Sequence, residues 1–90
     1  MLRIQFRELA NTTRMQIEGR FVGNFAENAR RAVVDSKPVS NLLVDLSGMT
    51  FVDDIGEEVL SWLKGIGSKF TAGTAYSHDV CERLELPLAF

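Results

Sequence analysis

The stretch that decides the fold is Asn41–Leu60, NLLVDLSGMTFVDDIGEEVL, in which an apolar segment leads into the acidic start of a helix. Residues 42–44, Leu-Leu-Val, are apolar without alternation, which is typical of a central strand covered on both faces. Residues 45–48, Asp-Leu-Ser-Gly, have the chemistry of a turn, so we expect the strand to end there. A second apolar pair, Phe51-Val52, comes directly before the paired carboxylates of Asp53-Asp54.

The acidic pair predicts a helix that begins near Ile55. Its carboxylates can accept hydrogen bonds from the free N–H groups of a first helical turn, and Glu57 follows Asp54 by three residues, as in a capping box. Residues 55–66, placed at 100° each, separate into a polar arc and an apolar arc. We expect the helix to bury the apolar arc, which holds Ile55, Val59, Trp62, Leu63 and Ile66.

The residues beyond this helix predict a strand and a short final helix. Gly67 ends the helix over residues 55–66. Residues 69–72 predict a strand that pairs in parallel with the strand at 42–44, because a helix separates the two. Ser77 can cap the short helix, which carries Val80, Cys81 and Leu84 on one side. Residues 86–90 form a possible last strand.

The first third of the chain predicts a hairpin followed by a helix. Apolar residues alternate with polar ones at positions 2–6 and 15–17, on either side of a turn at Asn11-Thr12. We expect a loop from Gly19 and a helix from Asn24 that ends at Lys37-Pro38. The buried face of that helix is expected to hold Phe25, Ala26, Ala29 and Val33.

These elements predict one α/β domain over residues 1–90, with a mixed, mostly parallel sheet, helices packed on it and an N-terminal antiparallel strand pair.

The net charge of −2 gives no general attraction to nucleic acids or anionic membranes. The apolar runs are too short for a membrane span or a signal peptide, so we expect a cytoplasmic protein. The single cysteine, Cys81, agrees with a reducing compartment. One histidine, with no pair of nucleophile and base and no metal-ligand spacing, predicts no enzyme, no cofactor and no metal.

The order of elements and residues 43–56 together resemble a STAS domain, the fold named after sulfate transporters and anti-sigma factor antagonists. In that family a buried strand is followed by Ser/Thr-Gly, an apolar pair, and Asp-Ser-Ser/Thr-Gly at a helix start. Here the strand is Leu43-Val44-Asp45-Leu46, and the later places are held by Ser47-Gly48, Phe51-Val52 and Asp53-Asp54-Ile55-Gly56. The resemblance covers essentially the whole chain.

The resemblance implies a non-catalytic protein-binding domain that acts as an anti-sigma factor antagonist in bacterial partner switching, a form of signalling that regulates transcription. The implied partner is a serine kinase that doubles as an anti-sigma factor. Such kinases phosphorylate a Ser or Thr at the position of Ile55, which has no hydroxyl group. Binding is therefore implied, whereas switching by phosphate at this position is not.

Other interpretations remain open. Some STAS domains are accessory subunits of membrane transport assemblies, for instance on the ATPase of an ABC-type lipid transporter. Nucleotide binding is proposed for some relatives, so a small-ligand domain is a further alternative. A homodimer is also compatible with the sequence.

The expected partner-binding surface is the helix start with the turn residues before it: Ser47, Gly48, Thr50, Asp53, Asp54, Ile55, Gly56, Glu57 and Glu58. A helix N-terminus favours negative charge, and this chain supplies up to four carboxylates there. These would imitate a permanently phosphorylated surface or complement a basic patch on a partner. In the competing interpretation Asp54 and Glu57 only cap the helix and Glu58 is solvated. A third interpretation is a cation site built from the carboxylates, although they lack a regular ligand spacing.

Overall fold

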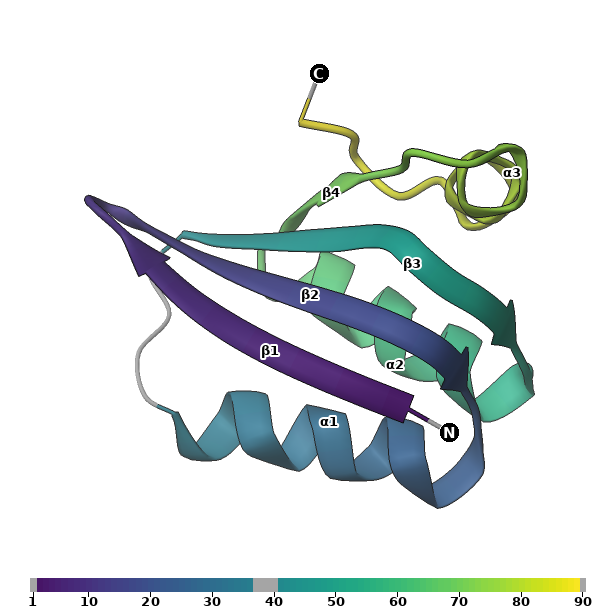
Figure 1. Ribbon diagram of the computed structural model, residues 1–90, viewed down its shortest axis with the longest axis horizontal. Coiled ribbons are helices and arrows are strands. Elements are labelled where there is room, and N and C mark those ends of the chain that lie inside the picture. Colours follow the sequence, from purple (N-terminus) through teal and green to yellow (C-terminus); the bar gives the residue numbers. More distant parts are fainter. Residues whose placement is uncertain (1, 37–40, 90) are drawn as a thin grey trace.

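A four-stranded mixed sheet with three helices makes up the protein (Figure 1). The computed structural model describes residues 2–36 and 41–89. The elements are β1 (Leu2–Leu9), β2 (Thr12–Phe21), α1 (Gly23–Asp35), β3 (Leu42–Val52), α2 (Asp54–Gly65), β4 (Lys69–Thr71) and α3 (Ala75–Leu84). The strand order is β1-β2-β3-β4, with β1 antiparallel to β2 and the other neighbours parallel, which confirms the predicted α/β fold.

The helices leave part of the sheet uncovered. Figure 1 shows α1 and α2 packed side by side beneath the sheet, whereas α3 lies above the second half of β3 and beside β4. The core between the sheet and α1 and α2 is apolar, and each of its side chains is at most 5% exposed. It includes Met15, Ile17 and Phe21 of β2, Val44 and Leu46 of β3, Ala26, Ala29 and Val33 of α1, and Val59, Leu60 and Leu63 of α2. No helix of residues 2–36 and 41–89 covers the other face over β1 and β2 (Figure 1).

The strand β3 does not end at residues 45–48 as predicted but continues to Val52. The reason is that the turn-forming side chain makes a bulge instead of a turn: Asp45 Oδ1 accepts a hydrogen bond from the Ser47 N–H at 2.9 Å, and the pairing of β3 with β2 shifts register at this point. A second register shift lies at Gly19, whose φ is 98°. The predicted loop from Gly19 is therefore wrong, because β2 runs on to Phe21.

The buried face of α2 is rotated from the predicted apolar arc by roughly 70° at 100° per residue. The buried residues are Gly56, Val59, Leu60 and Leu63, whereas Ile55 is 39% and Ile66 49% exposed. Gly56 explains this orientation. An added Cβ atom there would lie 2.1 Å from the Phe21 carbonyl oxygen and 2.6 Å from Val52 Cγ2, so the helix backbone lies directly against the end of β2.

Several smaller expectations are also corrected. The hairpin turn is Ala10-Asn11, one residue earlier than predicted, with Ala10 at a φ of 37°. Phe25 is 57% exposed, so it does not lie on the buried face of α1. Thr74 caps α3, while Ser77 completes its capping box as the third helical residue. The expected last strand is reduced to one bridge between Phe70 and Leu88. The predicted helix stop at Lys37-Pro38 lies outside the described residues.

None of the helices within the described ranges is long and apolar enough to cross a membrane.

A buried carboxylate joins three strands on the sheet face opposite α1 and α2. The Asp45 side chain, 6% exposed, pairs with Arg14 of β2 at 2.5 Å and accepts a hydrogen bond from the Thr71 hydroxyl of β4 at 3.2 Å. Burial acts to raise the pKa of Asp45, but the hydrogen bonds from the Ser47 N–H and from Arg14 outweigh it. The net effect holds the pKa below the ordinary value of 3.8, so the folded state favours the ionised carboxylate.

We predict that Asp45→Asn lowers the free energy of unfolding at pH 7 by about 1–3 kcal/mol, because a charged hydrogen-bonded pair is lost. A depressed pKa stabilises the folded state above the unfolded-state value of about 3.9, and this contribution is lost as the pH falls through the folded value. The difference between the wild-type protein and the variant should therefore stay constant from about pH 7 to pH 5 and shrink below about pH 4. Urea unfolding at several pH values measures it. Asp35→Asn, at an exposed position, is the control, and a difference that persists undiminished at about pH 2.5 would contradict the prediction.

We further predict that Gly56→Ala lowers the free energy of unfolding by at least about 2 kcal/mol, because the new methyl group must displace the Phe21 backbone. Gly65→Ala in the same helix is the matched control. No atom lies within 4 Å of a Cβ there, so stability should stay unchanged or rise by up to about 1 kcal/mol. Denaturant unfolding of both variants measures the effect, and equal stability of the two would show that α2 does not depend on this close contact.

Candidate functional site

The predicted site lies where β3 passes into α2, and Asp53 organises this junction. Asp53 is the N-cap of α2, with its Oδ1 accepting a hydrogen bond from the Gly56 N–H at 2.8 Å. Its Oδ2 accepts a second bond from the Gly23 N–H at 3.1 Å, at the start of α1. One carboxylate thus ties the beginnings of two helices together, and the expectation that Asp54 and Glu57 form the capping box is corrected.

Glu57 is engaged with α3. Its Oε2 lies 2.5 Å from Arg83 Nη1, and the Glu57 side chain is 25% exposed. The hydrogen bond to Glu57, followed by its negative charge, raises the pKa of Arg83, so the guanidinium group stays charged at neutral pH. The Val52 N–H also donates to the Tyr76 hydroxyl at 3.0 Å. These two contacts fix α3 beside the helix start.

The exposed part of the junction is smaller and less acidic than predicted. Asp54 and Glu58 are exposed, and so are Phe51 (43%) and Ile55 (39%). Arg20 lies over the Phe51 ring, with its guanidinium carbon 5.1 Å from the ring centre. We define the helix-start surface as Phe51, Asp54, Ile55 and Glu58. It offers two carboxylates beside two apolar side chains, whereas Asp53 and Glu57 are committed to partners within the fold.

The remaining predicted residues lie further back along β3. Ser47 sits in the first bulge, where a Cβ added at Gly73 would approach its Oγ to 2.5 Å. Gly48 lies against β2, because a Cβ there would be 2.8 Å from Glu18 Cγ. Ser47 precedes Asp53 by six residues of strand, a distance of up to about 20 Å. Ser47 and Gly48 thus lie further back along β3 from the helix start than exposed Thr50 does.

The geometry does not resemble a metal centre. Within residues 2–36 and 41–89, no three His, Cys, Asp or Glu side chains lie close enough together to hold a metal ion. At the helix start, Asp53 is directed to backbone N–H groups and Glu57 to Arg83, so the carboxylates do not converge on one point.

Sequence reasoning missed two features of the junction. The sequence names Phe51-Val52 only as an apolar pair, whereas the structure buries Val52, at 5% exposure, and leaves Phe51 exposed. Arg83 was not connected with Glu57, because the two residues lie 26 positions apart and nothing local signals their contact.

Comparison with solved structures identifies the fold, although no protein-family model matches the chain and no curated protein matches it in sequence. The anti-sigma factor antagonist SpoIIAA in its unphosphorylated form superposes with a TM-score of 0.69 at 12% identity, over 96% of this chain and 86% of that one. The murine Slc26a9 anion transporter in its inward-facing state gives 0.63 at 20% identity, and Mglu gives 0.60 at 16% identity.

The extent of these matches differs greatly. The Slc26a9 match covers 86% of this chain and 14% of the transporter, and the Mglu match covers 78% of this chain and 19% of Mglu. The chain therefore corresponds to nearly all of SpoIIAA and to less than a fifth of the other two. At these identities the likeness concerns the fold, and it agrees with the motif at residues 43–56. This chain therefore has a STAS-like fold.

Proposed function

We propose that this STAS-like domain is a non-catalytic regulatory module that binds another protein through the helix-start surface. The observation that carries the proposal is that Phe51 and Ile55 are exposed at the same β3–α2 junction as the exposed carboxylates of Asp54 and Glu58. Exposed apolar side chains in the company of charged ones are a usual composition of a protein interface. The supporting contacts of Asp53, Gly56 and Tyr76 hold this surface in place, so little ordering cost falls on binding.

The charge of the surface favours a basic partner. Asp54 and Glu58 are exposed and form no ion pair among the described residues, while Arg20 lies over Phe51. A basic patch on the partner would pair with these carboxylates and speed association, while Phe51 and Ile55 would supply apolar burial.

The most specific form of the proposal is an anti-sigma factor antagonist-like protein in bacterial partner switching. The similarity to SpoIIAA over nearly the whole of both chains supports this interpretation. The partner would then be a serine kinase that also acts as an anti-sigma factor, in the cytoplasm. Ile55 cannot accept phosphate, so the surface would be permanently competent to bind, with Asp54 and Glu58 supplying the fixed charge.

A second candidate is an accessory subunit of a membrane transport assembly. The observation that favours it is the match to a segment of the Slc26a9 anion transporter, in which a domain of this fold is part of a longer transport protein. The neighbouring genes distinguish the two candidates. A sensor kinase and a sigma factor would support the first, and a permease with an ATPase would support the second.

Charge reversal at Asp54→Arg/Glu58→Arg should weaken partner capture by roughly tenfold or more, because attraction to a basic patch becomes repulsion. Stability should change by about 1 kcal/mol or less, chiefly through the effect of Asp54 on the helix dipole. Glu57 is left unchanged in this variant because it pairs with Arg83. The measurement is affinity capture from lysate of the source organism, read by quantitative mass spectrometry, with urea unfolding of each variant.

The matched control is Glu8→Arg/Asp35→Arg, which changes the net charge equally at exposed positions near the opposite end of the molecule (Figure 1). If capture falls equally in both variants, the loss is explained by net charge and not by the helix-start surface. Capture that is unaffected by either would remove the helix-start surface as the binding site.

A serine kinase of the partner-switching type should leave the wild-type protein unmodified, because Ile55 has no hydroxyl group. Intact-mass spectrometry measures this, and Ile55→Ser is the positive control for kinase docking. An added phosphate mapped to Ser47, Thr50 or Ser61 in the wild-type protein would contradict the prediction and would reveal a displaced phosphoacceptor.

A further inference from the structure

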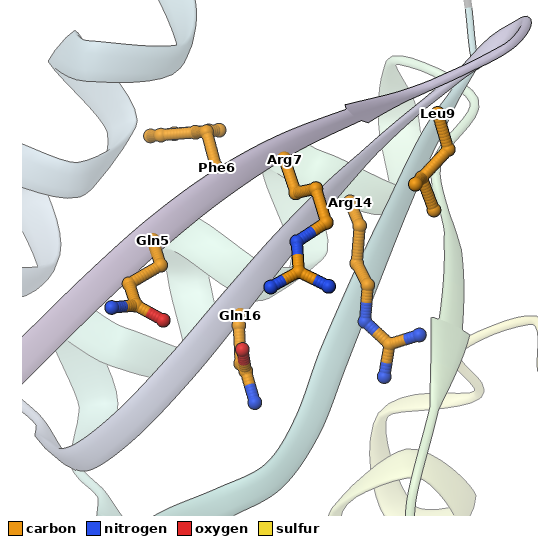
Figure 2. Close-up of a pocket in the computed structure, with 6 residues that line it drawn as sticks. All are labelled: Gln5, Phe6, Arg7, Leu9, Arg14 and Gln16. Atoms are coloured by element: carbon orange, nitrogen blue, oxygen red, sulfur yellow. The ribbon is translucent and has the colours of Figure 1, made fainter.

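The uncovered face of the sheet holds a hollow over β1 and β2 that the proposed function does not use. It has a volume of about 780 Å³ and is lined by Gln5, Phe6, Arg7, Leu9, Arg14 and Gln16. Figure 2 shows the two arginines and the two glutamines extending from the strands on the same side, while the Phe6 ring turns away toward a helix. This volume falls within the range of about 300–1,000 Å³ for small-molecule sites.

Two arginines face each other directly in this hollow. In the antiparallel ladder Arg7 is the register partner of Arg14, and Gln5 is the partner of Gln16. Like charges directly opposite one another on two strands destabilise a sheet. In the described part of the chain, Arg14 is paired with Asp45, whereas Arg7 has no carboxylate within ion-pair distance. The hollow therefore carries one excess positive charge.

The buried carboxylate also fixes the position of one arginine. Asp45 is held by the Ser47 N–H and the Thr71 hydroxyl, and it binds Arg14 through Nη2 alone. The Arg14 side chain remains 38% exposed, so its other N–H groups are free to meet a ligand in a set orientation. A donor that is positioned before binding loses little side-chain entropy when the ligand arrives.

We propose that this hollow binds a small organic anion, with a carboxylate or phosphate group seated between the guanidinium groups of Arg7 and Arg14. Guanidinium groups bind both kinds of oxyanion through paired, charge-assisted hydrogen bonds. The bound anion bridges the two arginines and balances the charge of Arg7, since Asp45 already balances that of Arg14. The amides of Gln5 and Gln16 bind polar groups on the body of the ligand.

The charges along the ladder favour a small ligand over an acidic polypeptide. The next charged register pair, Arg3 and Glu18, is internally neutral, with Arg3 Nε 3.9 Å from Glu18 Oε1. Arg3 is also occupied by Gln5, whose amide oxygen accepts from Arg3 Nη2 at 2.7 Å when it is turned toward that residue. The lining residue at the other end is the apolar Leu9. A run of acidic residues would thus meet a single excess charge.

The test is a titration followed by backbone amide chemical shifts, using inorganic phosphate and citrate as probes at constant ionic strength set with sodium chloride. In the wild-type protein, saturable shifts should be confined to residues around 5–8 and 14–16. Arg7→Gln should weaken binding of the responding probe by roughly tenfold, since a charged donor is lost. Arg7 is exposed and lies opposite a like charge, so this variant should fold with at least wild-type thermal stability.

Arg31→Gln is the control, because it removes the same charge from an exposed position on α1. The site is supported if either probe binds the wild-type protein and Arg31→Gln but not Arg7→Gln. The identity of the probe that binds shows whether the ligand group is a phosphate or a carboxylate. The proposal is overturned if neither probe gives saturable shifts, if Arg7→Gln binds as the wild-type protein does, or if a hexaglutamate peptide binds while both small probes fail. Because the hollow lies apart from the helix-start surface, the Asp54→Arg/Glu58→Arg variant should bind the probes normally, so the two proposals fail independently.

Discussion

The contact between the backbone of α2 and the end of β2 determines how the functional end of this protein is built. Gly56 brings the helix so close to the Phe21 carbonyl that no side chain fits between them. This contact sets the rotation of α2, because the residue nearest the sheet must lie at the centre of the buried face. Ile55, immediately before it, is then directed to the edge of that face and becomes exposed. An apolar side chain on the candidate surface is thus a consequence of a packing constraint one residue away.

The same junction determines which acidic groups are available to a partner. Hydrogen-bonding demand at a helix start is high, because the first N–H groups have no acceptor within the helix. Asp53 meets part of this demand for two helices at once, and its carboxylate is used in doing so. The Glu57 carboxylate is likewise occupied, because it forms an ion pair with Arg83 that connects α3 to α2. Four carboxylates in the sequence therefore become two free carboxylates in the fold, and a count of acidic residues overstates the charge that a partner would meet.

The order of elements, the parallel pairing around α2 and the STAS-like fold could all be inferred from the sequence, because hydrophobic periodicity and helix-start chemistry are local. The errors arose where one local signal fits two structures. Asp45 binding the N–H two residues ahead is compatible with a turn or with a bulge, and only pairing with β2 and β4 decides between them. Neighbouring aspartates can each cap a helix, and the choice of Asp53 depends on its reach to Gly23, 30 residues away. Likewise, placing the hairpin turn one residue late would put Arg7 opposite Gln16, whereas the observed register puts it opposite Arg14.

The register error matters because it conceals how charge is distributed over the molecule. A net charge of −2 describes an average of two unlike surfaces. Two free carboxylates lie at the start of α2, while an unpaired guanidinium lies on the bare face of β1 and β2, where it is opposed by a second arginine. Like charges opposite one another on two strands lower the stability of a sheet, whereas an oppositely charged pair such as Arg3 and Glu18 does not. Asp45 balances the charge of Arg14, so the charge left without a partner in the described part of the chain is that of Arg7, and an anion between the two guanidinium groups would balance it.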